Sequence, residues 1–188
     1  MKGTIMAELF SGEIYIGGKI PRSKLPGLIQ AINKQQCCWD WGDSTIELGD
    51  EIEPAITELL KRIEDTGQEL LWLCDDDARY GELEIIENFC LKNDIGFRRF
   101  SEGCGDYSPE IAEFRPEWEG VDDYVTDSNG NPMIPGTDVK LLLDALDSAE
   151  EDFLEDEQKK FQIVGLRENV QNLLPRKVDE LEPFEIID

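Results

Sequence analysis

Apolar and polar positions alternate in some stretches of the chain, whereas in others apolar residues recur every three to four positions. The first pattern predicts strands, and the second predicts helices with one buried face. Strands are expected over residues 4–10, 13–20, 45–48, 69–74, 95–100, 111–114, 121–126 and 132–134. Helices are expected after Pro21 and Thr137, and over residues 51–65, 81–93 and 166–174. The pattern therefore predicts an α+β fold, with a sheet of about five to seven strands and amphipathic helices packed on it.

Glycines and one long apolar run add detail to the predicted sheet. The first two strands are expected to form a tight hairpin at Ser11 and Gly12. Gly17 and Gly18 lie inside the second strand, where glycine indicates a bulge or the close approach of another backbone segment. Residues 69–74 are apolar from their second position onward, so they are the best candidate for a central buried strand.

The helix expected after Thr137 combines an apolar stripe with a high density of acids. The stripe consists of Val139, Leu142, Leu143, Leu146, Ala149, Phe153 and Leu154. The other faces carry a row of carboxylates, Asp144, Asp147, Glu151 and Glu155, with Glu150, Asp152 and Asp156 beside it. Like charges at this spacing repel by about 0.2–0.5 kcal/mol per pair, so the arrangement costs stability. We expect a core domain over residues 1–134 and an acidic helical segment over residues 135–188, whose tail is either flexible or docked on a partner.

The formal net charge of the 188-residue chain is −25, and it is unevenly distributed. Residues 1–34 carry a net charge of +3, whereas residues 101–157 hold eighteen carboxylates against Arg115 and Lys140. An acidic surface disfavours direct binding of nucleic acid, which needs lysine and arginine, and it also disfavours anionic membranes. It favours fast, salt-sensitive association with a basic protein surface. The alternative explanations are solubility alone and adaptation to high salt.

The cysteine and histidine content limits the chemistry that the chain can perform. The five cysteines are odd in number, form no C-x-x-C motif and include the adjacent Cys37 and Cys38, so we expect reduced thiols in the cytoplasm. The absence of histidine excludes Ser-His-Asp and Cys-His catalysis and histidine-containing zinc sites. The start lacks the apolar core of a signal peptide, and no apolar run reaches membrane-spanning length. We expect no cofactor, and a binding protein rather than an enzyme.

One acidic triplet supports an alternative enzymatic hypothesis. Asp75, Asp76 and Asp77 follow the predicted buried strand, a position at which magnesium enzymes hold their metal. The same triplet also fits a solvated loop in which one aspartate caps the next helix. The alternative function is therefore a small metal-dependent enzyme that uses these three residues.

The spacing of the acids supports a more specific binding hypothesis. Side chains three or four residues apart on a helix stand about 5–6 Å from each other, which is comparable to the phosphate spacing of a nucleic-acid strand. Acidic composition of this kind is shared by DNA-mimic proteins, which phages and mobile elements use against restriction or CRISPR systems. The predicted partner-binding residues are Asp122, Asp123, Asp144, Asp147, Glu150, Glu151, Asp152, Glu155 and Asp156. We expect a DNA-mimic-like inhibitor, such as an anti-CRISPR or antirestriction protein, that occupies the basic surface of a nucleic-acid-binding protein or complex.

An immunity protein that neutralises a basic toxin nuclease is the second binding hypothesis. It predicts the same acidity and uses Trp39, Trp41 and Trp118 as aromatic anchors. Trp39 and Trp41 flank Asp40, and the pair either forms a binding platform or caps an edge of the core.

Overall fold

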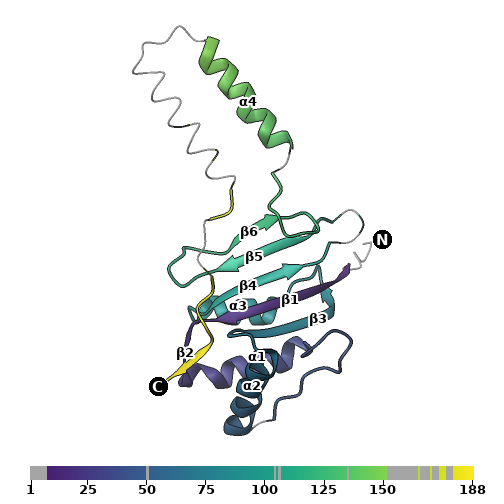
Figure 1. The fold of residues 1–188 in the computed structure, drawn as a ribbon, viewed down its shortest axis with the longest axis vertical. Helices are drawn as coiled ribbons and strands as arrows, with labels where there is room; N and C mark the ends of the chain where they lie inside the picture. The colour runs from purple at the N-terminus through teal and green to yellow at the C-terminus, as the bar shows by residue number, and fades with distance from the viewer. Residues whose placement is uncertain are drawn as a thin grey trace, which may run out of the picture.

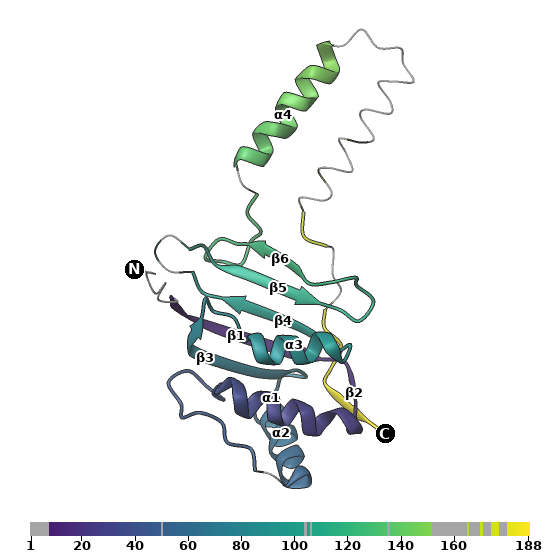
Figure 2. The same cartoon turned by 180° about the vertical axis from the view of Figure 1, so that it is seen from behind.

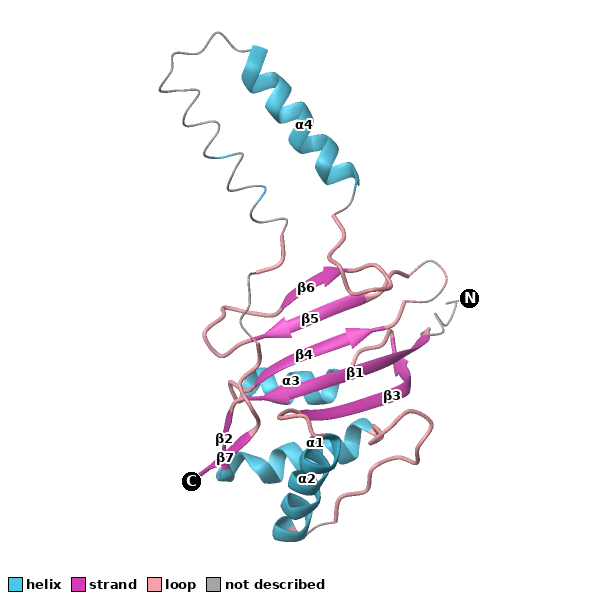
Figure 3. Cartoon of the chain, viewed as in Figure 1, coloured by secondary structure: helices cyan, strands magenta, loops and turns pink. Residues whose placement is uncertain are grey.

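Residues 8–49, 51–103, 105, 107–134, 136–151, 165, 170, 174–176 and 180–188 are described in a computed structural model of the chain. Of residues 145–151 it describes the backbone only. The described residues form a mixed α+β fold, which confirms the predicted fold class. Figure 3 shows most of the strands gathered into one sheet, with helices beside it and two short strands paired apart from it.

A five-stranded sheet is the centre of the fold (Figure 1). Its order is β3-β1-β4-β5-β6, and every neighbouring pair is antiparallel. The strands are β1 (Leu9–Gly17), β3 (Leu71–Arg79), β4 (Gly96–Ser101), β5 (Glu110–Phe114) and β6 (Asp122–Val125). A separate parallel ladder joins β2 (Lys19–Pro21) to β7 (Glu185–Ile187).

Three helices cover one face of the sheet (Figure 2). They are α1 (Leu25–Gln35), α2 (Ile52–Thr66) and α3 (Glu84–Lys92), and a short 3-10 helix over Arg22–Lys24 precedes α1. The core lies between them and the sheet, because alternate strand residues such as Ile14, Ile16 and Phe97 are fully buried against the apolar faces of the helices. The opposite face carries no helix among the described elements, as is common for antiparallel sheets.

Several predictions about the sheet are wrong. No strand forms over residues 45–48 or 132–134, where only Thr45 and Pro132 take part in single β-bridges. Ser11 and Gly12 do not form a hairpin, because β1 runs straight through them. A glycine is needed at position 12 since an added Cβ would lie 2.4 Å from the carbonyl oxygen of Gly81. β3 contains the apolar run but lies at the edge of the sheet rather than at its centre. Leu71 and Leu73 are buried there because they face the helices, and a β-bridge between Cys38 and Cys74 covers the outer edge of the strand.

The last residues of the chain form what we call the C-terminal strap, residues 180–188, which lies on the chain's own core. Phe184 is buried, and its backbone N–H donates to the oxygen of Glu69 at 2.7 Å. Gly17 allows this packing, because an added Cβ would lie 2.3 Å from the carbonyl oxygen of Glu182. The predicted close backbone approach at Gly17 is thus confirmed, and the described part of the tail, residues 180–188, packs on the core of its own chain.

The helix α4 (Gly136–Glu151) extends away from the sheet beyond β6, as Figures 1 and 2 both show. The chain returns to the sheet at Arg176, whose backbone N–H donates to Asp122 of β6 at 2.8 Å. None of the helices in the described part of the chain combines the length and hydropathy needed to cross a bilayer.

Candidate functional site

The predicted acidic residues that the structure describes lie on α4 and on the neighbouring edge strand β6. Asp144 is exposed on α4, and Asp123 is exposed on β6. Asp147, Glu150 and Glu151 belong to α4, but their side chains lie outside the described structure, as do Asp152, Glu155 and Asp156 entirely. The contribution of these residues to partner binding therefore stays a prediction.

The first residues of the apolar stripe of α4 are exposed to solvent. Val139 and Leu143 are 42% and 54% exposed, so the described part of the chain does not bury them. An amphipathic helix usually buries such a stripe against its own core. In this structure, the first turns of α4 instead present acids and apolar side chains together to solvent.

Acidity alone does not mark one face of the core. Exposed carboxylates also lie on α2 and on the strap, for example at Glu58 and Glu182. What distinguishes α4 is its position away from the sheet rather than the sign of its charge (Figure 1).

The aspartate triplet lies inside β3 rather than in a loop after it. Asp75 is paired with Gly12, whereas Asp76 and Asp77 together stand opposite the single residue Ser11 in a bulge. Asp76 accepts a hydrogen bond from the backbone N–H of Gly42 at 2.9 Å, and Asp75 accepts one from that of Asp77 at 3.0 Å. Over the residues that the structure describes, no three acidic or cysteine side chains gather in an arrangement that could hold a metal ion.

The helix-free face of the sheet carries a row of polar and aromatic side chains, of which only Asp122 was predicted as a functional residue from the sequence. Strand register places these residues side by side across all five strands: Trp72, Tyr15, Arg98, Glu113 and Asp122. The signal in the sequence was the presence of charged residues in the middle of short apolar strands. Their pairing was not visible, because it depends on which strands are neighbours and in which register.

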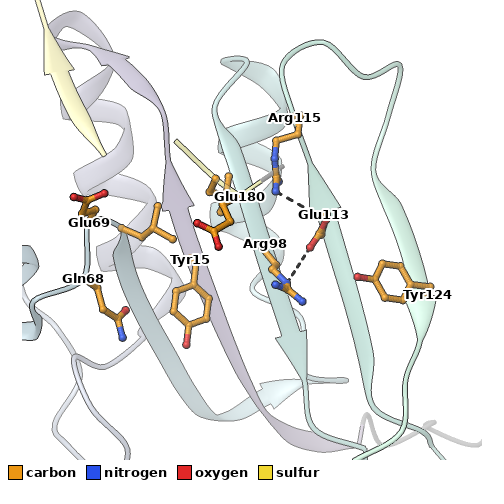
Figure 4. A pocket seen from close by; sticks show the side chains of 10 residues that line it. Tyr15, Gln68, Glu69, Arg98, Glu113, Arg115, Tyr124 and Glu180 are labelled. Atoms are coloured by element: carbon orange, nitrogen blue, oxygen red, sulfur yellow. Dashed lines mark ion pairs between the residues drawn. The ribbon is translucent and has the colours of Figure 1, made fainter. Parts of the chain in front are cut away.

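A cavity of about 650 Å³ lies over the middle of this row, at Tyr15, Arg98 and Glu113, and is bordered by Glu180 of the C-terminal strap (Figure 4). Its central group is Glu113, which is only 3% exposed. Arg98 Nε lies 2.9 Å from Oε1 of this carboxylate, and Arg115 Nη2 lies 3.9 Å from Oε2. Burial lowers the pKa of Arg115, and the Glu113 carboxylate opposes this effect. The cavity thus presents fixed, paired charges and suits the binding of a polar group better than acid–base catalysis.

The three tryptophans proposed as anchors have different surroundings. Arg62 lies over the ring of Trp39 at 5.9 Å, so Trp39 packs at an edge of the core. Trp118 is contacted by two arginines of its own chain, Arg115 at 5.5 Å and Arg176 at 4.9 Å. Trp41 is 43% exposed and is therefore the accessible member of the three.

Tyr15 should titrate later than an ordinary tyrosine. Burial and the neighbouring Glu13 carboxylate raise its pKa from 10.0 to about 12. The folded state keeps this proton between pH 10 and pH 12 while the unfolded state loses it, so stability should fall as the pH rises through that window. The phenolate absorbance of the folded protein should show this late step. Tyr15→Phe should reduce the step without abolishing it, because burial also raises the pKa of Tyr124. A complete phenol titration centred near pH 10, in a protein still folded by circular dichroism, would contradict the assignment.

No protein-family model, curated protein or solved structure matches this chain.

Proposed function

We propose that this protein binds a basic surface of a partner protein through an acidic arm, defined as residues 136–157. The arm carries nine carboxylates and one lysine, Lys140. The observation that supports the proposal most directly is the position of α4, which extends away from the sheet into solvent (Figure 2). A helix in this position can enter a groove that the core of the protein could not.

The partner class follows from the charge of the arm. Clefts that bind DNA or RNA are lined by lysine and arginine, and they release counterions when a polyanion occupies them. A row of helical carboxylates supplies negative charges at about 5–6 Å spacing, so it competes for the same cleft. The proposed partner is therefore a nucleic-acid-binding protein or complex, including a restriction or CRISPR effector. A toxin nuclease also presents a basic nucleic-acid-binding surface, so an immunity protein that neutralises such a nuclease is a second form of the same proposal.

Neutralising the arm should weaken binding to such a partner. In the triple variant Asp147→Asn, Glu151→Gln, Glu155→Gln, each lost ion contact removes about 0.2–1 kcal/mol, so affinity should fall about 10-fold. The salt dependence of binding should also become shallower, because fewer counterions are released. The measurement is competition with a fluorescent DNA duplex for purified nucleases and DNA-binding proteins, followed by anisotropy at increasing salt.

A matched variant on the core controls for net charge. Glu58→Gln, Glu64→Gln and Asp65→Asn remove the same charge from exposed positions of α2. This control should retain most of the affinity. Equal losses in the two triple variants would show that only total charge matters, and the arm would no longer be the contact surface.

A further inference from the structure

Three aromatic rings from distant parts of the chain form an aromatic platform, defined as Trp41, Trp72 and Tyr15. The ring centroids of Trp41 and Trp72 are 6.3 Å apart at an interplanar angle of 69°. Those of Tyr15 and Trp72 are 6.5 Å apart and nearly stacked, at 28°. Trp41 is exposed at the rim, and the other two are half-buried on the helix-free face of the sheet.

Glu13 holds two of these rings in place. Its Oε2 accepts a hydrogen bond from Trp72 Nε1 at 2.9 Å and one from the Tyr15 hydroxyl at 3.3 Å. Donation to a carboxylate shifts electron density toward the ring, which strengthens the attraction of the ring face for a cation. The platform is thus oriented before any partner arrives.

The loop that carries Trp41 is also fixed to the sheet. The backbones of Cys38 and Cys74 exchange hydrogen bonds of 2.6 and 3.1 Å. Gly42 follows Trp41 in the chain, and its backbone N–H donates to the Asp76 carboxylate at 2.9 Å. A partner therefore meets a pre-ordered tryptophan, which lowers the entropy cost of binding.

The charge beside Trp41 is negative. Asp40, Asp43 and Asp76 are all exposed, and Asp40 and Asp76 accept hydrogen bonds from the loop backbone at Trp41 and Gly42. Arg98 lies beside Tyr15 in the register of the sheet and is paired with Glu113. A cation should therefore bind at the Trp41–Trp72 end of the platform rather than at the Tyr15 end.

Two other tryptophans of this chain already have a cation over the ring. Trp39 and Trp118 each have an arginine of this chain over the ring, at 4.9–5.9 Å. Within the described residues, no such contact is found for Trp41 or Trp72. A guanidinium group stacks on aromatic faces and is more weakly hydrated than an ammonium group.

We propose that the Trp41–Trp72 end of the aromatic platform is the receptor for an arginine side chain of the basic partner. This inference rests on the proposed function only in assuming that the partner is basic. It adds a contact on the core that is independent of the acidic arm. Exposed tryptophans in ordered surroundings, rimmed by charges, are typical anchors of protein–protein interfaces.

The test is a titration with two peptides, hexa-arginine and hexa-lysine, at physiological ionic strength. The indole N–H signals of the four tryptophans are followed by NMR. Hexa-arginine should shift the signals of Trp41 and Trp72 but leave those of Trp39 and Trp118 in place. It should also bind several-fold more tightly than hexa-lysine.

Trp41→Ala should lower the affinity for hexa-arginine about five-fold and remove the preference over hexa-lysine. The matched control is Tyr107→Ala, which truncates an aromatic side chain of similar exposure, 47%, in a separate cluster with Phe10 and Tyr80. This control should keep both the affinity and the preference. Circular dichroism checks that both variants are folded, as expected for exposed positions.

The outcomes separate this proposal from the one for the arm. Unchanged hexa-arginine binding by Trp41→Ala, or shifts spread equally over all four indoles, would overturn the arginine receptor. The arm variant should leave the Trp41 and Trp72 shifts intact. If the arm variant keeps full affinity for DNA-binding partners while Trp41→Ala loses it, the arm proposal fails and the platform stands.

Discussion

Replacing Arg99 by methionine should lower the free energy of unfolding by about 3–5 kcal/mol. Arg99 lies on the helix-facing side of β4 and is 3% exposed. Its Nε lies 3.1 Å from Glu87 Oε1 of α3, and its Nη2 contacts Glu110 of β5. Methionine would leave the Glu87 carboxylate, itself only 16% exposed, without a positive charge beside it. Breaking one partner of a buried ion pair is costly because the other charge stays desolvated.

The loss should depend on pH in a defined direction. Burial raises the pKa of Glu87 above its ordinary value of 4.5, and Arg99 is the main group that opposes this rise. Removal of Arg99 should therefore raise the pKa of Glu87 in the folded state further. The folded variant then keeps this proton at a pH at which the unfolded chain has lost it. The defect should therefore be smaller near pH 5 than near pH 8, as measured by urea unfolding.

A matched variant tests whether burial is the cause. Arg22 also pairs with a glutamate, Glu53, but both side chains are largely exposed, at 46% and 71%. Arg22→Met should therefore change stability very little. A second test is the double variant Arg99→Met, Glu87→Gln, which should recover part of the loss. Similar effects for Arg22→Met and Arg99→Met would contradict the role given to burial.

Replacing Gly17 by alanine should detach the C-terminal strap and cost about 2–4 kcal/mol. The added Cβ would lie 2.3 Å from the carbonyl oxygen of Glu182 and 2.7 Å from Leu70 Cδ2. The carbonyl belongs to backbone, so it cannot move aside as a flexible side chain can. Detachment exposes Phe184, whose burial contributes about 1.5–3 kcal/mol, and breaks the ladder between β2 and β7.

Hydrogen exchange gives the local readout for this variant. The amides of Phe184 and Glu185, which donate to Glu69 and Gly18, should lose protection before the rest of the sheet. Gly120→Ala is the control, because an added Cβ there has no atom within 4 Å. The control should be neutral or slightly stabilising, by up to about 1 kcal/mol. Retained protection at Phe184 in Gly17→Ala would show that the strap tolerates a side chain at this position.

The sequence was sufficient for features that depend on a few neighbouring residues. The apolar periodicity of residues 51–65 and 81–93 predicted all but the last residue of α2 and the whole of α3, because a helical face is a local property. The glycine pair at positions 17 and 18 predicted a close backbone approach, because glycine inside a strand leaves space for one. The acidity of the chain, and with it the hypothesis of a basic partner, also came from sequence alone.

The tertiary structure alone decided the order of the strands and the groups that meet across them. The apolar run predicted a buried strand correctly. It did not predict the position of β3, because an edge strand covered by helices and by the Cys38 loop has the same apolar pattern as a central strand. Arg98 meets Glu113, and Tyr15 meets Trp72, because the strand register sets them side by side. Trp41 meets Trp72 because the loop that carries it folds back onto the sheet. Register depends on pairings between distant segments, and local periodicity carries no information about which segments pair.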